Sequence, residues 1–297
     1  MATLYTHAES NVRKTWLLVS LFLVFIIGLG WVFSQYFQNP SILVFAVIFA
    51  LSMNLISFWY SDKIVLSLIK ARLIEKKDSP ELYRVVENLC IASGLPLPRI
   101  YIIPELQPNA FATGRDKNHA VIAITQGLLA KLDKAELEGV IAHELSHIGN
   151  KDALLMTLVV VLVGFVSIIS DWFLRSMWFG GLRKRDDRSG QMGSILALVG
   201  IVLAVLSPLI ALLIQMAISR KREFLADASG ALLTRFPEGL ARALEKISAD
   251  KNPMRIASTA NAHLFIASPF RGKSLSSLFL THPPIEQRIK ALREMAI

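Results

Sequence analysis

Two long apolar stretches open the chain and predict a membrane hairpin. Residues 16–33 and 42–58 are each close to the roughly 20 residues that a helix needs to cross about 30 Å of hydrocarbon. A short uncharged link containing Asn39-Pro40 separates them. No small-residue cleavage pattern follows the first stretch, which argues against a removed signal peptide. We therefore expect residues 1–61 to form an N-terminal transmembrane hairpin.

Two more apolar stretches follow later in the chain. Residues 153–170 and 194–218 carry almost no charge, and Ser207-Pro208 in the second predicts a kink of the kind that membrane helices tolerate. The interval 153–218 is therefore predicted to hold a second hydrophobic helical hairpin.

The interval 62–152 alternates apolar and polar positions as a water-exposed folded segment does. Helical spacing over 80–95 ends at Gly94 and Pro96. Asp133 and Glu136 form a capping-box pattern that predicts the start of another helix. Three short runs rich in branched and aromatic residues predict strands at 99–104, 109–114 and 119–125.

The remaining residues, 219–297, show mostly helical spacing after the last apolar stretch. The whole pattern predicts an α+β membrane protein that is mainly α-helical, with a small β-sheet and up to four transmembrane helices. Its folded domain outside the membrane is expected in two parts, 62–152 and 219–297, on either side of the second hydrophobic hairpin.

Composition agrees with a polytopic membrane protein. Hydrophobic residues make up 53% and charged residues only 19%, against a quarter charged in typical soluble domains. The net charge of +9 comes from basic residues at the ends of apolar runs, as membrane flanks require, so we expect no nucleic-acid partner. The single cysteine, Cys90, excludes an internal disulfide and a cysteine-rich metal site.

The segment VIAHELSHIGNKD, residues 140–152, carries the main chemical signal. His143 and His147 are four residues apart, so on a helix both imidazoles point to one side and could bind one Zn²⁺. Glu144 lies one step round the helix, where it could take a proton from water and pass it to a leaving amine. HExxH also occurs by chance on helix surfaces, so these five residues alone predict catalysis only weakly.

A catalytic zinc needs a third protein ligand. The extended HExxHxxGxxH pattern is excluded, because Asn150 stands at its glycine and Ala153 at its third histidine. The ligand must come from further along the chain, where the candidates are Glu223, Asp227, Glu238, Glu245, His263, His282 and Glu286.

Glu223 and Asp227 are the best placed of these candidates. They are again four residues apart, so Glu223 could bind the metal while Asp227 accepts a hydrogen bond from a ligand imidazole. If 153–218 is a hairpin, both of its ends lie on one membrane face. His147 and Glu223 would then lie at the same height above the membrane surface. The alternative is a solvated charged face that continues Arg220–Arg222.

HELSH at 143–147, EFLAD at 223–227, NAFATG at 109–114 and the two N-terminal membrane segments together identify a resemblance. The chain resembles the membrane-bound gluzincin zinc peptidases, most closely their bacterial HtpX branch, over nearly its whole length. The similarity is weakest at 171–193 and after about residue 235.

The resemblance implies one Zn²⁺ per chain on His143, His147 and Glu223, with Glu144 as general base. It implies an ATP-independent endopeptidase in the bacterial inner membrane that degrades misassembled membrane proteins in the envelope stress response. It also implies that Asn109 lies along the substrate cleft and that His282 assists at the site. From the residues themselves, we expect 109–114 to be an exposed edge strand that pairs with an extended peptide.

Basic residues flank the outer ends of the first hairpin, whereas the link 34–41 has no charge. The positive-inside rule therefore predicts a cytoplasmic catalytic domain. The link 171–193 is also basic, although a complete second hairpin would place it outside. The second hairpin therefore either crosses despite the rule or does not fully span, and both alternatives leave His147 and Glu223 on the same side.

Three other functions remain as alternatives. An intramembrane metalloprotease would bury HExxH within a span, but charged residues occupy the preceding turns, which is costly at membrane depth: Lys134, Glu136 and Glu138. A non-catalytic membrane chaperone or scaffold would hold a structural zinc, which usually needs four Cys or His ligands. A transporter would need ionisable residues within its spans.

Overall fold

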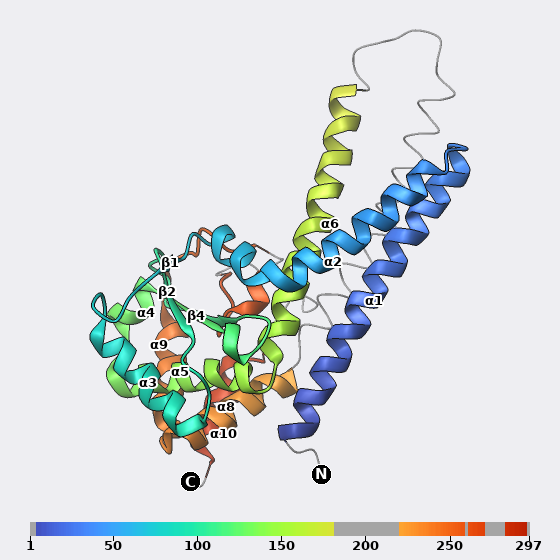
Figure 1. Cartoon of the computed structure of the whole chain (residues 1–297). Coiled ribbons are helices and arrows are strands. Elements are labelled where there is room, and N and C mark those ends of the chain that lie inside the picture. Colours follow the sequence, from blue (N-terminus) through green and yellow to red (C-terminus); the bar gives the residue numbers. More distant parts are fainter. Residues whose placement is uncertain (1–3, 181–219, 259–260, 271–282, 296–297) are drawn as a thin grey trace.

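The computed structural model describes residues 4–180, 220–258, 261–270 and 283–295. Helix α1 (Leu4–Tyr36) and helix α2 (Ser41–Leu68) run antiparallel and form the long arm in Figure 1. Both are long and apolar enough to cross a membrane, over Ala8–Tyr36 and Ser41–Leu68. Large apolar side chains point outward from this arm, as contact with lipid requires: Trp16, Val24, Trp31, Phe45, Ile48 and Leu55.

Helix α6 (Asp152–Gly180) is the third apolar helix. Its side chains Leu155, Leu162 and Val166 pack with Leu18 and Phe22 of α1 in one hydrophobic cluster. The chain bends by 82° between helix α5 (Lys134–Gly149) and α6, and this bent pair counts as a third candidate span if it is taken as one. The described residues thus contain two to three candidate spans. The fourth apolar stretch, 194–218, lies outside the described residues.

We call residues 69–151, together with the described residues of 220–295, the compact part of the molecule. It contains a four-stranded sheet with strand order β1-β2-β4-β3. The central strands β2 (Arg99–Ile103) and β4 (Val121–Thr125) are parallel, and both outer pairs are antiparallel. The outer strands are β1 (Arg72–Leu73) and β3 (Ala110–Thr113). The three predicted strands are confirmed, whereas β1 was not predicted, because two residues are too short to show a period.

The predicted helices of the compact part are also present. Helix α3 (Pro80–Ser93) ends at Gly94, whose φ of 67° is favourable for glycine and allows the chain to turn. After the short α4 (Gln126–Lys131), helix α5 (Lys134–Gly149) begins with the predicted capping box between Asp133 and Glu136. The structure therefore confirms a mostly helical fold with a small sheet.

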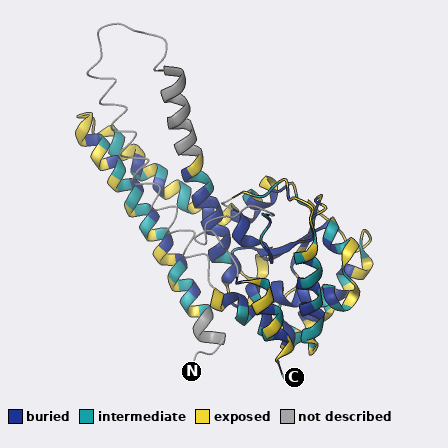
Figure 2. Ribbon diagram, turned by 180° about the vertical axis from the view of Figure 1, so that it is seen from behind, coloured by how far each residue is buried: buried dark blue, intermediate teal, exposed yellow. Residues whose placement is uncertain are grey.

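The C-terminal segments surround α5. They are α8 (Arg220–Thr234), α9 (Pro237–Ala249), a 3₁₀ turn η2 (Ala262–Leu264) and α10 (Ile285–Arg293). A Cβ on Gly230 of α8 would lie only 2.9 Å from the backbone nitrogen of His143, so glycine is needed for α8 to lie this close to α5. Figure 2 shows that buried residues concentrate around α5, the sheet and the lower part of α6.

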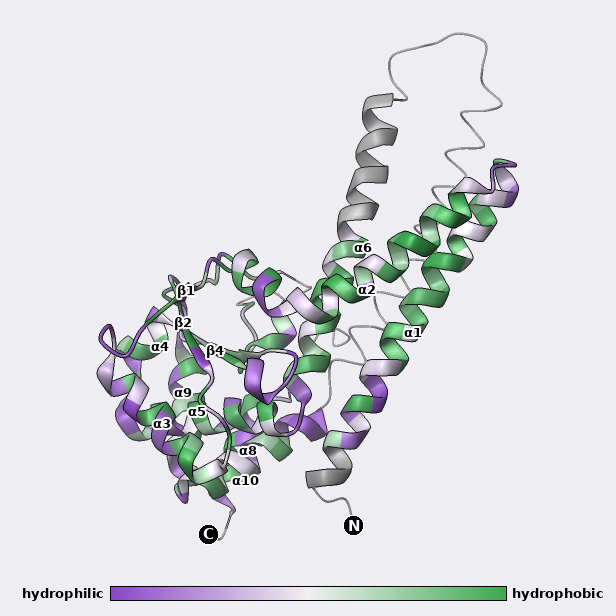
Figure 3. Ribbon diagram, viewed as in Figure 1, coloured by the Kyte–Doolittle hydropathy of each residue, from purple (hydrophilic) through white to green (hydrophobic). Residues whose placement is uncertain are grey.

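Hydropathy divides the molecule in the same way. Figure 3 shows α1, α2 and the described part of α6 as mainly hydrophobic, whereas the compact part alternates hydrophilic and hydrophobic turns. The HExxH helix α5 lies in the compact part, close to the point at which α6 leaves it. The fold therefore places the predicted metal ligands next to the membrane helices.

Candidate metal centre

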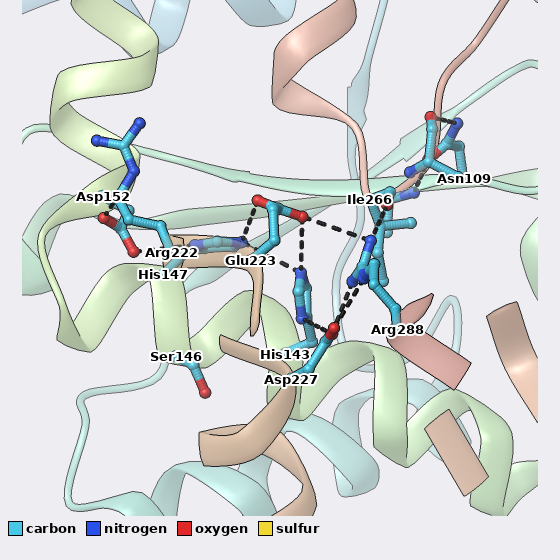
Figure 4. A network of polar contacts seen from close by, with 12 residues as sticks. Asn109, His143, Ser146, His147, Asp152, Arg222, Glu223, Asp227, Ile266 and Arg288 are labelled. Atoms are coloured by element: carbon cyan, nitrogen blue, oxygen red, sulfur yellow. Dashed lines mark hydrogen bonds and ion pairs between the residues drawn. The ribbon is translucent and has the colours of Figure 1, made fainter. Parts of the chain in front are cut away.

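Three potential ligands converge from two helices. His143 and His147 lie on α5 and Glu223 lies in the first turn of α8, and all three are buried. One ligand atom from each lies within 4.8 Å of the others. Glu223 Oε1 is 3.6 Å from His147 Nε2, and Oε2 is 4.0 Å from His143 Nε2. Figure 4 shows the Glu223 carboxylate facing both imidazoles.

The arrangement of the two imidazoles fits a metal ion. Their Nε2 atoms are 3.1 Å apart. Two nitrogens, each about 2.0–2.1 Å from a tetrahedral zinc, would lie about 3.3 Å apart. Two imidazoles and one carboxylate are also a donor set typical of catalytic zinc sites. The buried cluster can therefore hold a divalent cation such as zinc.

Each imidazole is oriented by a carboxylate on the side away from the cluster. His143 Nδ1 lies 2.9 Å from Asp227 Oδ1, and Asp227 comes from α8, one turn after Glu223. Sequence reasoning placed Asp227 beside a ligand imidazole, and its effect on the metal stays a prediction. Buried Arg288 of α10 binds Asp227 with two hydrogen bonds of 2.7 Å. Its Nη1 atom is also 3.4 Å from Glu223 Oε2.

His147 has a different support. Its Nδ1 atom lies 3.1 Å from Asp152 Oδ2, at the first residue of α6. The other oxygen of Asp152 accepts a hydrogen bond from the Asn11 side chain and lies 3.5 Å from Arg222 Nε. Both Nδ1 atoms are therefore engaged by carboxylates, which leaves both Nε2 atoms directed to the metal position.

The electrostatic environment differs between the two histidines. Burial lowers the pKa of His143. Burial also acts to lower the pKa of His147, but the hydrogen bond to Asp152 and the charge of Glu223 outweigh it and raise this pKa to about 9. Burial alone would raise the pKa of Asp227, yet the adjacent Arg288 guanidinium holds it below its usual range. The centre is thus a network of charges that stabilise one another.

Glu144, the predicted general base, lies on α5 between the two histidines in sequence and is buried. Burial raises the pKa of its carboxyl to about 7, and the negative charge of Glu223 adds to this shift. A group that takes up and returns a proton works best when its pKa is close to the working pH. The environment of Glu144 suits that chemistry, and its catalytic role stays a prediction.

Residues 110–113 form an edge strand of the sheet, as expected, but the expectation that this strand is exposed is wrong. All residues of β3 are buried. The segment after η2 lies along the outer edge of β3, where Ile266 N–H donates to the Ala110 carbonyl. The Asn109 amide donates to the Ala267 carbonyl at 3.0 Å, and its oxygen lies 3.4 Å from Ala267 N. The two segments are far apart in the sequence, so periodicity could not reveal this cover.

The other candidate ligands lie elsewhere or outside the described residues. His263 is buried against α6, with Nε2 at 3.2 Å from the Met156 carbonyl. Glu238 and Glu245 each pair with Arg293 on the outer face of α10. Glu286 is exposed. His282 lies outside the described residues.

Sequence reasoning missed four residues of the network, Asn11, Asp152, Arg222 and Arg288. Asp152 was noted only as the end of the HExxH segment. Arg288 lies in a short amphipathic helix that follows Pro283-Pro284, and an arginine in such a helix is not by itself a sign of function. Asn11 precedes the first apolar stretch by five residues, where a polar residue is expected in any case.

Comparison with known proteins agrees with this geometry. The model of peptidase family M48 matches residues 76–296. A protein named Protease HtpX homolog from Caldanaerobacter subterraneus subsp. tengcongensis is 47% identical over 297 residues, covering 99% of both chains. One of the same name from the archaeon Thermococcus sibiricus is 48% identical over 286 residues, covering 95% of this chain and 96% of the relative.

A solved structure has a similar fold. The crystal structure of S. mikatae Ste24p matches with a TM-score of 0.51 at 20% sequence identity, covering 94% of this chain and 67% of that one. The candidate spans of the described residues support a membrane location, and because the relatives include an archaeon, they do not specify a bacterial inner membrane.

Proposed function

The chain belongs to peptidase family M48 and is a membrane metallopeptidase, and we propose that it uses one Zn²⁺ to hydrolyse peptide bonds of misfolded or damaged membrane proteins without ATP. The observation that carries this proposal is the convergence of His143, His147 and Glu223 beside Glu144, next to the bend into α6. No other cluster of this kind is present among the described residues.

The residues divide the chemistry between them. The Nε2 atoms of His143 and His147 and the Glu223 carboxylate would hold the zinc. When bound, zinc supplies a positive charge that polarises the scissile carbonyl and acidifies water. Glu144 takes the proton from the attacking water and gives it to the departing amine, so that one carboxyl group both accepts and returns the proton.

A Glu144→Gln variant tests the catalytic assignment. The amide keeps the shape of the side chain but cannot accept the proton, so we expect bound zinc to stay near one per chain. Cleavage of an unfolded protein in detergent should fall by roughly 10²–10⁴-fold. Normal cleavage by this variant would contradict the assignment. A wild-type protein that binds zinc and cuts nothing would instead favour a scaffold.

The third ligand is tested by a matched pair of glutamates. Glu223→Ala should sharply lower the zinc content measured after dialysis. Glu245→Ala removes the same group from an exposed ion pair with Arg293, so its zinc content should equal that of the wild type. If Glu223→Ala retains full zinc, another residue completes the site.

We further propose that Asn109 binds the substrate backbone. Support comes from the chain's own Ile266 and Ala267, whose backbone groups are held by Asn109, by the Ala110 carbonyl and by Arg288 Nη1. A substrate that lies along β3 takes over these bonds, which involve backbone groups and so allow broad sequence preference. His282 is proposed, from the resemblance alone, to assist at the site.

Amide exchange tests this docking mode in the inactive Glu144→Gln variant. Substrate binding should increase exchange at the Ile266 amide, because its hydrogen bond to Ala110 is lost. Exchange that stays the same or slows on binding would show that the substrate lies elsewhere.

We propose that the compact part faces the cytoplasm. Basic residues at both outer ends of the α1–α2 hairpin support this orientation, for example Arg13, Lys14, Lys63 and Lys70. Externally added protease should therefore degrade the compact part in inside-out vesicles and spare it in right-side-out vesicles. The reverse pattern would overturn the orientation.

A further inference from the structure

The N-terminal membrane helix α1 contacts the residues around the metal centre through the side chain of Asn11. Asn11 on α1 is 3% exposed and belongs to the candidate span Ala8–Tyr36. Its Nδ2 atom donates to Asp152 Oδ1 at 2.6 Å and to the Asn150 carbonyl at 2.9 Å. Its oxygen accepts from Arg222 Nη1 at 3.5 Å. Both hydrogens of the amide and its oxygen are therefore used.

The partners of Asn11 are the groups that orient His147. Asp152 Oδ2 lies 3.1 Å from His147 Nδ1, so one carboxylate joins the Asn11 amide to the metal ligand. The second bond goes to the carbonyl of Asn150, the residue that caps α5 at its C-terminus. Asn11 thus holds both the carboxylate and the end of the HExxH helix, at the 82° bend into α6.

Helix packing alone does not account for this arrangement. Further along α1 and α6, the two helices share a hydrophobic cluster that includes Leu18, Phe22, Leu158 and Leu162. Burying an amide costs free energy unless it is hydrogen-bonded, so an apolar residue could have served packing at position 11. A carboxylate that supports a metal-binding histidine, however, needs donors that fix its own orientation.

We propose that Asn11 is a positioning residue of the metal centre, which acts through Asp152 on His147, so that the first membrane helix completes the site. The inference rests on the metal binding in the proposed function and goes beyond it. Metal affinity of the compact part depends on a helix of the N-terminal hairpin, and correct membrane assembly is coupled to a functional metal site.

The test measures metal binding rather than activity, with the full chain in detergent. Asn11→Leu keeps a similar size and removes the amide. We expect zinc affinity, measured by competition with a chelator, to fall about 10–100-fold. The visible spectrum of bound Co²⁺ should also shift, because the orientation of His147 changes. Asn54→Leu is the matched control, since Asn54 lies on α2 and its amide binds only the Ala50 carbonyl of the same helix among the described contacts.

A double-mutant cycle separates positioning from packing. In an Asp152→Asn background, Asn11→Leu should cause little further loss of zinc affinity, because its effect passes through Asp152. Equal losses in both backgrounds would show a structural role only and overturn the inference. So would a folded Asn11→Leu protein with wild-type zinc affinity and Co²⁺ spectrum.

If Asn11→Leu does not fold, Asn11→Asp replaces the donor amide by an acceptor of the same shape. We expect this variant to lose zinc affinity as well, because a carboxylate then faces Asp152. Wild-type affinity in Asn11→Asp would overturn the inference. A wild-type chain that binds no zinc would instead contradict the proposed function itself, so the two failures are distinguishable.

Discussion

The two histidines of the metal centre are supported by different regions of the molecule. The carboxylate beside His143 comes from α8 and is held by Arg288 of α10, entirely within the compact part. The carboxylate beside His147 comes from the first residue of α6, where it accepts a hydrogen bond from Asn11 of α1 and lies 3.5 Å from Arg222 of α8. One support lies entirely within the compact part, whereas the other joins the compact part to the membrane helices.

The two supports should therefore differ in how they affect stability and metal affinity. The buried Asp227–Arg288 pair is bidentate, and removing one partner would leave an uncompensated buried charge, so substitutions on this side should mainly lower stability. Asp152 has looser partners, the uncharged Asn11 amide and Arg222 at 3.5 Å, so the Asn11–Asp152 side should adjust the metal site at smaller cost to the fold. Substitutions on the two sides should therefore separate stability from metal affinity.

The largest effect is expected on the compact side. Arg288→Met removes the partner of Asp227 and leaves a buried carboxylate without its cation, which should cost about 3–5 kcal/mol in the free energy of unfolding. Denaturant unfolding in detergent, followed by circular dichroism, measures this loss. Arg293→Met on the same helix removes only exposed pairs with Glu238 and Glu245 and should cost less than about 1 kcal/mol. Equal losses would remove the distinction between the two sides.

The next effect concerns the close approach of α8 to α5, on which Glu223 and Asp227 both depend. Gly230→Ala would place a Cβ 2.9 Å from the backbone nitrogen of His143, so α8 must move. Overpacking of this kind costs about 1–3 kcal/mol and should also weaken zinc binding, because Glu223 moves with the helix. Gly149→Ala on α5 is the control, since its Cβ would meet only Leu95 at 3.9 Å. Unchanged stability and zinc content in Gly230→Ala would contradict the close packing.

A paired substitution then compares the two carboxylates directly. Asp227→Asn and Asp152→Asn should each lower zinc affinity about 10–100-fold, because an amide supports an imidazole less well than a carboxylate. Asp227→Asn should in addition lower stability, since it weakens the pair with Arg288, whereas Asp152→Asn should leave the unfolding midpoint closer to the wild type. Chelator competition and denaturant unfolding on the same samples measure both quantities. Equal destabilisation by the two variants would show that the supports do not differ.

Much of the fold could be predicted because its signals are local. The apolar stretches, the capping box at Asp133 and the strands around 99–125 each follow from neighbouring residues. The two-residue strand β1 could not be predicted, because pairing with β2 rather than its own sequence defines it. The contact of residues 266–267 with β3 could not be predicted either, because it joins segments more than 150 residues apart.

The metal centre shows a similar limit. His143, His147 and Glu144 follow from one helical motif, and Glu223 with Asp227 from a second. Asn11 and Arg288 make contacts with residues 141 and 61 positions away, and neither stands in a pattern that marks it as functional. Sequence spacing can find ligands that share a helix face, but it cannot find residues that orient them from other elements.

The smallest expected effect is on the rate at which the single cysteine is alkylated, which also separates the two regions. Cys90 lies in the core of the compact part with Leu292 of α10, is 5% exposed, and burial raises the pKa of its thiol to about 11. Alkylation requires the thiolate, so labelling of the native protein at pH 8 should be slow and should speed up as the pH rises towards 11. Arg288→Met should accelerate labelling at pH 8 by opening this core, whereas Asn11→Leu should leave the rate unchanged, because Asn11 contacts the α5–α6 bend rather than the Cys90 cluster. Mass spectrometry of the intact chain follows the reaction at a single site. If Asn11→Leu exposes Cys90 as fast as Arg288→Met does, the membrane helices stabilise the whole compact part, and the division between a stabilising side and an adjusting side is lost.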